Sequence, residues 1–296
     1  MKIIDGHHHL WAPQSPDLDV GYVWLKEIGV RRPFGDPTPI QRDYLLEELR
    51  GEQAAHPLVG SVHLQCDPRI PDPVAETAFV QRISDAAEFP IMLVGYANLA
   101  QDDCAQILDR HAAHPNFRGI RQILSHLPDH PEISFVTENL LEDLAWRANF
   151  AQLGERGLSF DLMLYPEQMT TAADFLAQHP DIPVVLEHLG SPWDLSRDGM
   201  ARWRDGMECL AALPHVSAKL SGYAMYFGSA LGDQARVVTQ GILEIFGPER
   251  VIFGSNFPVD LLHLTYADML DFLMAEVPAE HHQAIFHDNA REFYRF

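Results

Sequence analysis

Residues 158–189 read LSFDLMLYPEQMTTAADFLAQHPDIPVVLEHL, a stretch that predicts a strand, a helix and a second strand. The apolar runs at 158–164 and 183–189 are typical of buried strands, and the apolar residues of 168–179 have helical spacing. A helix between two strands is the unit from which parallel sheets are built. This stretch therefore predicts an α/β fold with a parallel sheet.

The same alternation continues on both sides of this stretch. Six further strands are expected, at 2–6, 58–65, 90–96, 118–124, 215–221 and 250–255, and helical patterns occupy 74–88, 101–113, 139–156, 199–212 and 234–246. Eight such units in 296 residues predict a closed (β/α)₈ (TIM) barrel that forms a single domain over residues 1–296. A doubly wound open sheet is the alternative. Its nucleotide-binding version is disfavoured, because no G-x-G-x-x-G or G-x-x-x-x-G-K-[ST] motif follows a strand.

Composition excludes several classes of protein. Hydrophobic residues make up 47% of the chain, which is incompatible with a disordered protein. The 21 basic and 42 acidic residues give a net charge of −21, which disfavours binding to nucleic acid or to an anionic membrane. No 18-residue apolar run and no signal peptide are evident, and three widely spaced cysteines fit a reducing compartment. We expect a cytoplasmic protein with a small-molecule substrate, and homo-oligomer formation stays open.

The segment 11–43 differs from the rest of the chain. It is rich in proline and aspartate, and it follows the first strand, so in a barrel it forms a long loop over the C-terminal face. Long loops within compact domains are usually functional or disordered. Tyr22, Trp24 and Phe34 argue against disorder.

The strongest chemical signal is the sequence DGHHH at 5–9, where the first strand ends. Strand periodicity places His7 and His9 on one side, with Asp5 one layer deeper on that side. Two imidazoles at this spacing can bind one divalent ion or one anionic group. The alternative is a loop of three solvated histidines.

Other candidates lie at the ends of later strands, where active sites of barrels form. The alternation of Val184, Leu186 and His188 predicts that His188 points inward, although a core histidine would give the same pattern. Asn256, in FGSNFPVD (253–260), is expected to project into the site, and Asp260 to lie beyond the turn facing solvent. Arg121 in GIRQIL is expected inside the barrel, where it either pairs with an acid or binds an anion. Asp161 and Lys219 are weaker candidates, with core hydrogen bonding as the alternative.

Seven motifs, running from residue 3 to residue 294, together resemble the amidohydrolase superfamily: IIDGHHHLW, GIRQIL, FDLMLYP, VVLEHLGSP, SAKLSGY, VIFGSNFPVD and DNAREFY. They are most similar to its metal-dependent hydrolase branch, which contains 2-pyrone-4,6-dicarboxylate lactonase, 4-sulfomuconolactone hydrolase and the L-fucono- and L-rhamnono-lactone hydrolases. The resemblance implies a (β/α)₈ barrel.

By position, His7 and His9 correspond to the family's first-strand pair, and His188 to the histidine beside the substrate carbonyl. Arg121 falls where related lactonases contact an acidic substrate. We therefore predict a metal set of His7, His9 and His188 and a catalytic set of His188, Asn256 and Arg121, to which Asp260 is added from its place in the sequence as an alternative base.

Two positions depart from the family pattern. Asn256 stands where the family usually has an aspartate that activates water, and the fifth strand has no lysine to bridge two metals. A two-metal site is therefore not expected. Because asparagine cannot accept a proton at neutral pH, three alternatives stay open. His188 or Asp260 is the base, or one divalent ion (zinc or manganese) lowers the pKa of its own water, or the chemistry is not hydrolysis. Metal-independent catalysis also stays open.

The favoured function is hydrolysis of a small anionic or polyhydroxylated lactone or ester, of the sugar-acid or aromatic-degradation kind. A nonoxidative decarboxylase or lyase of the same superfamily is the alternative, and an inactive binding protein is the third hypothesis. Of the two candidate bases we favour His188, because a free imidazole titrates near pH 6.5.

Overall fold

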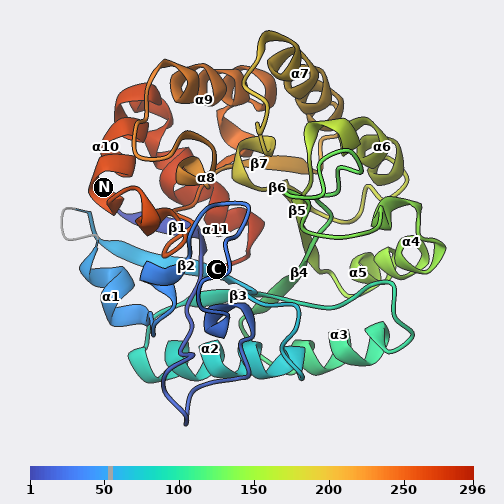
Figure 1. Cartoon of the computed structure of the whole chain (residues 1–296), viewed down its shortest axis with the longest axis vertical. Helices are drawn as coiled ribbons and strands as arrows, with labels where there is room; N and C mark the ends of the chain where they lie inside the picture. The colour runs from blue at the N-terminus through green and yellow to red at the C-terminus, as the bar shows by residue number, and fades with distance from the viewer. Residues whose placement is uncertain (53–55) are drawn as a thin grey trace.

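The computed structural model describes residues 1–52 and 56–296. Its centre is a parallel sheet whose eight strands lie side by side in chain order, which confirms the predicted (β/α)₈ barrel (Figure 1). All eight strands occur where the sequence predicts them. Their bounds are β1 Ile3–His8, β2 Leu58–Leu64, β3 Ile91–Gly95, β4 Phe117–Ile123, β5 Ser159–Met163, β6 Val184–Leu186, β7 Val216–Leu220 and β8 Val251–Phe253.

Helices surround the sheet in Figure 1 and cover the outer faces of the strands. They are α1 Leu46–Gly51, α2 Pro73–Ala87, α3 Cys104–Ala112, α4 Leu144–Phe150, α5 Gln152–Glu155, α6 Pro166–Leu176, α7 Arg197–Ala211, α8 Tyr223–Phe227, α9 Asp233–Phe246, α10 Tyr266–Glu276 and α11 Asn289–Phe293. The helix predicted over 139–156 is divided into a 3₁₀ turn at Leu140–Glu142, α4 and α5. Within the two described ranges, no helix has the length and hydropathy that spanning a bilayer would require.

Two glycines form the seam where the first strand meets the last. A Cβ on Gly6 would lie 2.7 Å from the carbonyl oxygen of Phe253, and one on Gly254 would lie 2.5 Å from the Cβ of His7. Beyond the end of β8, the amide of Asn256 donates to the carbonyl of His7 over 2.7 Å. The absence of side chains at both glycines therefore lets β1 approach β8 and close the barrel.

The strands bury both of their faces. One apolar cluster fills the barrel interior with Ile4, Val62, Val94, Val185 and Ile252, while a larger one joins the outer faces to the helices. The C-terminal segment covers the end of the barrel at which the strands begin, opposite the mouth. Tyr294 joins the interior cluster, and the ring of Phe296 occupies the space that a Cβ on Gly60 would need.

The predicted long loop after β1 crosses the opposite, C-terminal end of the barrel (Figure 1). Its first 3₁₀ turn, Trp24–Lys26, is fixed by Asp67, which follows β2 and accepts hydrogen bonds from the backbone N–H groups of Val23 and Trp24. The indole N–H of Trp24 also donates to the carbonyl of Cys66 over 2.9 Å. The loop is thus attached to the rim of the barrel.

Candidate active site

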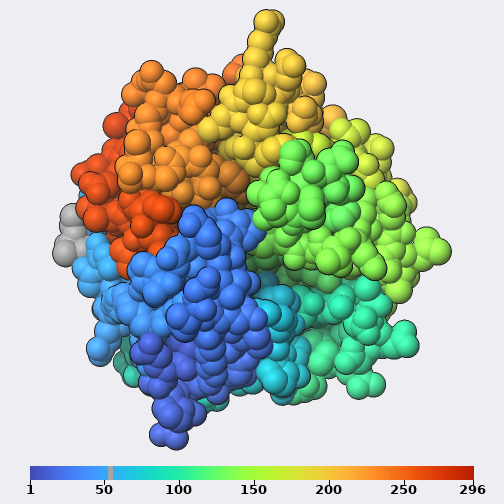
Figure 2. All heavy atoms as spheres, viewed as in Figure 1, coloured from blue at the N-terminus to red at the C-terminus, as the bar shows by residue number. Residues whose placement is uncertain are grey.

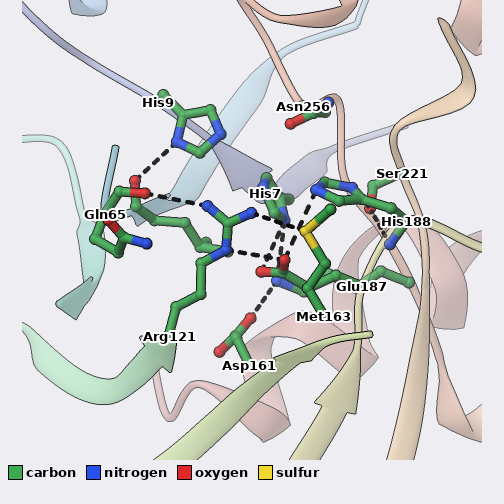
Figure 3. Close-up of polar contacts among 12 residues, drawn as sticks. His7, His9, Gln65, Arg121, Asp161, Met163, Glu187, His188, Ser221 and Asn256 are labelled. Carbon is green, nitrogen blue, oxygen red and sulfur yellow. Dashed lines mark hydrogen bonds and ion pairs between the residues drawn. The ribbon is translucent and has the colours of Figure 1, made fainter. Parts of the chain in front are cut away.

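His7 and His9 both point into the barrel mouth at the end of β1, as the sequence predicts (Figure 3). Asp5 does not share their side. The pairing of β1 with β2 is irregular between Asp5 and His8, which shifts the alternation by one residue. Gly6 therefore faces the interior residue Ile252, while Asp5 lies on the outer face and accepts from the amide of Ser255. His8 also faces outward and hydrogen-bonds Ser61 over 2.9 Å.

His188 reaches the mouth by a different route from the predicted one. Val184 and Leu186 belong to the outer cluster and Val185 to the inner one, so the residue of β6 that alternation directs inward is Glu187. The strand ends at Leu186, and His188 has a φ of 49°, in the left-handed region. That backbone conformation turns the imidazole into the site, where Ser221 hydrogen-bonds its Nδ1 over 3.1 Å.

Asn256 lies at the mouth after β8, also with a left-handed φ of 58°. Its amide nitrogen donates to Asp260 over 2.8 Å, so its oxygen is directed toward His9 (Figure 3). The expectation that Asp260 faces solvent is wrong: its side chain is fully buried. A 3₁₀ turn over Asp260–Leu262 folds it back toward α8, where it accepts from the amide of Ala224 over 3.1 Å.

The three site histidines lie close together. The ring centroids of His7 and His188 are 4.5 Å apart, and those of His7 and His9 are 5.2 Å apart. Residues from β1 and β6 therefore form one cluster at the C-terminal end of the sheet. The Nδ1 of His9 donates to the carbonyl of Leu64 over 2.8 Å, so in the neutral ring the Nε2 carries no proton.

Arg121 pairs with an acid, which is one of the two alternatives that the sequence left open. Its Nε donates to Glu187 over 2.9 Å, its Nη1 donates to the carbonyl of Gln65 over 3.2 Å, and its guanidinium also lines the cavity described below. The same carboxylate lies 3.6 Å from the Nδ1 of His7 and 3.7 Å from the Nε2 of His188. Glu187 thus links the arginine to both histidines (Figure 3).

A second buried ion pair lies beneath the histidines. Lys219 on β7 donates to Asp161 on β5 over 2.5 Å, and its Nζ is 3.4 Å from the Nδ1 of His7. The hydroxyl of Tyr294 also donates to Asp161, over 2.7 Å. The sequence assigns no role to Glu187 or to Tyr294. The available signal for Glu187 is a charged residue next to a run of apolar strand residues.

Burial sets the protonation of the histidines. It lowers the pKa of His7, His9 and His188 well below 6.5, and the positive charges of Lys219 and Arg121 act in the same direction. All three imidazoles are therefore neutral at pH 7, the form in which histidine binds metals. The assumption that His188 titrates near its reference value is therefore wrong. Of the two candidate bases, Asp260 has the pKa near neutrality, because burial raises it to about 7.

One set of side chains at the mouth fits a divalent metal. A donor atom from each of His7, Glu187 and His188 lies within 4.8 Å of the other two. Among the described residues, the Nε2 of His7 and the Oε1 of Glu187 are buried without a hydrogen-bond partner. Two neutral imidazoles and a carboxylate are common zinc ligands. His9 lies beside this set.

A second cluster, His63, Cys66 and Glu76, has the composition of a metal site but not the right proton positions. The amide of Leu10 donates to the Nδ1 of His63 over 3.1 Å, so the proton of the neutral ring is on Nε2, which faces Glu76 at 3.7 Å. A nitrogen that carries a proton cannot bind a metal. Burial also raises the pKa of the Cys66 thiol. This cluster therefore supports the rim of the barrel.

A cavity of about 500 Å³ opens above these residues. Figure 2 shows a hollow beside the long N-terminal loop, near the middle of the molecular face. His9, His188, Asn256 and Arg121 line its floor, together with Gln65, while His7 does not line the cavity itself. The walls are mostly apolar and come from the loops after β1, β4 and β7, as well as from the end of β5: Trp11, Trp24, Phe34, Phe135, Val136, Met163 and Met225.

Comparison with known proteins gives relatives along the whole chain. A protein of Sinorhizobium fredii of unstated function is 34% identical and covers 100% of this chain and 99% of its own. An L-fucono-1,5-lactonase of Burkholderia multivorans is 29% identical, over 90% of this chain and 85% of the lactonase. A zinc-bound amidohydrolase structure from Burkholderia multivorans superposes with a TM-score of 0.78 at 25% identity, covering 100% of both chains. With residues 4–296 matching its family description, the chain belongs to the amidohydrolase family.

Proposed function

We propose that the protein hydrolyses the ring ester of a small lactone in the cavity at the C-terminal end of its barrel. The observation that carries the proposal is the convergence of neutral His9 and His188, Asn256 and Arg121 on the floor of one cavity. The lactonase name of two relatives, which are 29% and 27% identical, supports the same reaction.

The proton positions assign roles at the floor. The Nε2 of His9 and the side-chain oxygen of Asn256 are both acceptors, so together they can hold the two hydrogens of a water molecule. His188 accepts the proton as this water attacks the carbonyl carbon, and Glu187, 3.7 Å away, stabilises the imidazolium that forms. The proton then passes to the ring oxygen as the C–O bond breaks, which yields a hydroxy acid.

Arg121 positions the substrate in this proposal. After its bonds to Glu187 and Gln65, its guanidinium retains N–H groups that can hold a substrate carboxylate. Because Glu187 balances its charge, the arginine can stay buried without a substrate.

His7, His188 and Glu187 are the residues that would hold one divalent ion, zinc or manganese. With the ion bound, His188 would be a ligand and would not also accept the proton. A bound ion supplies Lewis-acid polarisation of the carbonyl and lowers the pKa of a bound water. The described acceptors also suffice to orient water without it, so metal-free hydrolysis is the alternative.

The test is acid release from a panel of five- and six-membered lactones, measured before and after treatment with a chelator. We expect ring opening without CO₂. Release of CO₂ from aromatic acids, with no lactone opened, would identify a decarboxylase instead.

His9→Ala and His7→Ala should each reduce kcat/KM by about 100-fold or more. The first removes the Nε2 that accepts a hydrogen bond from the water, and the second removes the imidazole that packs against His188. Their folding should be largely retained, since both residues lie at a strand end. His8→Asn is the matched control, because His8 faces Ser61 outside the barrel. A soluble His9→Ala enzyme with wild-type turnover would refute the assignment.

A further inference from the structure

Gln65, which follows β2 on the floor of the cavity, carries a buried side-chain amide without a partner. Only 1% of the residue is exposed, and its Oε1 is buried without a hydrogen bond. Its Nε2 makes no hydrogen bond to residues 1–52 or 56–296 either. A buried polar group without a partner is rare and costs free energy of folding. The N–H groups of this amide are therefore available to a molecule in the cavity.

The backbone fixes the position of Gln65 within the site. Its carbonyl accepts a hydrogen bond from the Nη1 of Arg121 over 3.2 Å. The carbonyl of Leu64, the preceding residue, accepts from the Nδ1 of His9 over 2.8 Å. Gln65 is thus held next to both Arg121 and His9. Figure 3 shows these three residues on one side of the site, with His188 on the other.

A second glutamine that lines the same cavity has both ends of its amide engaged. The Oε1 of Gln122 accepts from the backbone amide of Leu99 and from the indole of Trp146. Its Nε2 donates to Asn98 over 3.0 Å. Gln122 therefore supports the fold, whereas the amide of Gln65 supports no part of it.

The proposed reaction needs a hydrogen-bond donor at the carbonyl oxygen of the ester. His9 and Asn256 present acceptors to the water, so they cannot stabilise the negative charge that develops on this oxygen. In the proposed function, Arg121 binds the substrate carboxylate. The amide of Gln65 lies beside both Arg121 and His9 and supplies the missing donor.

Two further free donors of the cavity lie at its rim. The hydroxyl of Tyr96 makes no hydrogen bond to the described residues, and Tyr96 also lines a neighbouring surface groove. The Nε of Arg32 is buried without a partner, and Arg32 belongs to the long loop that crosses the mouth. Both can bind other groups of the substrate. Gln65 is the better placed for the carbonyl, because it is held next to His9, where the water is proposed to bind.

We propose that the Nε2 of Gln65 donates a hydrogen bond to the carbonyl oxygen of the lactone; this rests on the lactone hydrolysis proposed above. As the water oxygen bonds to the carbonyl carbon, the π electrons of the carbonyl move to its oxygen, and the hydrogen bond strengthens with the charge. When the ring C–O bond breaks, its electron pair stays on the ring oxygen, which takes the proton from His188, and the carbonyl double bond re-forms. Gln65 is then a catalytic residue that contacts the reacting oxygen.

Gln65→Met tests this role, because methionine keeps the length of the side chain and cannot donate. On the lactone that the wild type opens fastest, kcat should fall by about 100-fold, with KM changed by less than about 3-fold. The Tm should equal or exceed that of the wild type, because no hydrogen bond within the protein is lost. A folded variant with wild-type kcat overturns the inference. A loss of kcat with a lowered Tm also overturns it, because Gln65 would then support the fold.

Gln122→Met is the matched control. Its Tm should fall by about 3 °C or more, because buried groups lose their partners, while kcat of the folded enzyme should change by less than about 3-fold. The two glutamines should therefore separate stability from turnover in opposite ways. If the control loses as much kcat as Gln65→Met, the effect is one of cavity shape and the inference fails.

A binding measurement separates this inference from the proposed reaction. Calorimetry compares pyroglutamate, a carboxylated lactam, with cyclopentanecarboxylate, which has the same ring size and carboxylate but no ring carbonyl. The preference for pyroglutamate should fall by about 3- to 10-fold from the wild type to Gln65→Met, as expected for one hydrogen bond. If it falls while no lactone is opened, the proposed reaction fails and Gln65 is still a carbonyl donor. An unchanged preference overturns the inference.

Discussion

Asn256 stands where the resemblance to the amidohydrolases leads us to expect an aspartate, and Asp260 lies directly behind it. The amide faces the cavity, and the carboxylate lies behind it, buried and hydrogen-bonded to its nitrogen. In the proposed mechanism, Asp260 acts through Asn256, because its hydrogen bond to the amide nitrogen directs the amide oxygen to the cavity. Burial raises the pKa of Asp260 from 3.8 to about 7. A buried carboxyl with a pKa near neutrality is typical of functional sites.

The first prediction concerns activity in Asp260→Asn. Ionised Asp260 is the stronger acceptor for the amide, so wild-type kcat should rise with pH through about 7, and this dependence should disappear in the variant. The variant should lose about 10-fold in kcat, and His188→Asn should lose far more, because His188 is the proposed proton acceptor. The pH–rate profiles measure both effects. A wild-type profile that is flat from about pH 5 to 8 would contradict this assignment.

The same substitution should affect stability in the opposite direction. Folding raises the pKa of Asp260 from 3.8 to about 7, so the folded state binds this proton more tightly than the unfolded state. The resulting contribution to the free energy of unfolding is greatest below pH 3.8 and is lost as the pH rises through about 7. Asp260→Asn removes the cost of burying the charge, so its free energy of unfolding at pH 8 should exceed that of the wild type by about 1–4 kcal/mol. Urea unfolding at pH 5 and pH 8 tests the sign. A variant that is less stable at pH 8 would show that the carboxylate stabilises the fold.

The next prediction concerns Glu187 and the proton on His7. The Nδ1 of His7 lies between Lys219, which can only donate, and the Oε1 of Glu187, which can only accept and has no hydrogen-bond partner among the described residues. A proton on Nδ1 satisfies the carboxylate and leaves Nε2 free to bind a metal. Glu187→Gln can instead donate to Nδ1, which would place the proton on Nε2.

Glu187→Gln should therefore lower zinc affinity by about 10- to 100-fold, as measured by competition with a chromogenic chelator. It should also lower the free energy of unfolding by about 3 kcal/mol, because Arg121 loses its buried counter-ion. Glu76→Gln is the matched control, since Glu76 is also a buried carboxylate beside a histidine but lies outside the proposed metal set. Equal zinc affinity in the two variants would exclude Glu187 from that set.

At the scale of the strands, the seam between β1 and β8 makes a specific demand on sequence. Gly6 faces Ile252 and the backbone of Phe253, and a backbone atom cannot rotate away as a side chain can. Gly6→Ala should therefore lower the free energy of unfolding by about 1–3 kcal/mol, the usual cost of overpacking. Because the seam carries His7 and Asn256, kcat should fall as well.

Gly51→Ala is the control for this substitution. Gly51 ends α1, and a Cβ there would meet no atom of residues 1–52 or 56–296 within 4 Å. Alanine should leave stability unchanged or raise it by up to about 1 kcal/mol, because it favours helix more than glycine does. Thermal unfolding of both variants makes the comparison. Equal stability of the two would show that the seam tolerates a side chain.

The barrel as a whole balances its buried charges in two layers. Arg121 pairs with Glu187 near the mouth, and Lys219 pairs with Asp161 below it. Tyr294, from the end of the chain, donates to Asp161, and its ring lies 5.3 Å from the Nζ of Lys219. The C-terminal segment therefore completes the lower layer as well as covering the barrel.

Tyr294→Phe should lower the free energy of unfolding by about 1.5–3 kcal/mol, because it removes a hydrogen bond to a buried charged group. Tyr165→Phe removes a bond to the neutral carbonyl of Ile133 and should cost about 1 kcal/mol. Urea titration with matched slopes measures both losses. A smaller loss for Tyr294→Phe than for Tyr165→Phe would show that Asp161 does not depend on this hydroxyl.

The barrel and much of its mouth follow from local patterns. Short apolar runs separated by helical patterns place all eight strands, because each run must be buried between the barrel interior and the helices. Strand ends in a barrel meet at one face, which is why His7, His9, His188 and Asn256 could be assigned to one site without coordinates.

Side-chain directions within that site required the folded chain. The strand β6 is buried on both faces and apolar at every position, so Val184, Val185 and Leu186 give no period that distinguishes inside from outside. Glu187 therefore could not be recognised as the inward residue, and the irregularity of β1 reverses the side of Asp5. Asp260 depends on a turn that brings it to α8, and the apolar walls depend on loops that meet only in space. Local sequence determines which segments are buried, whereas backbone irregularities and long-range contacts determine which atoms face the substrate.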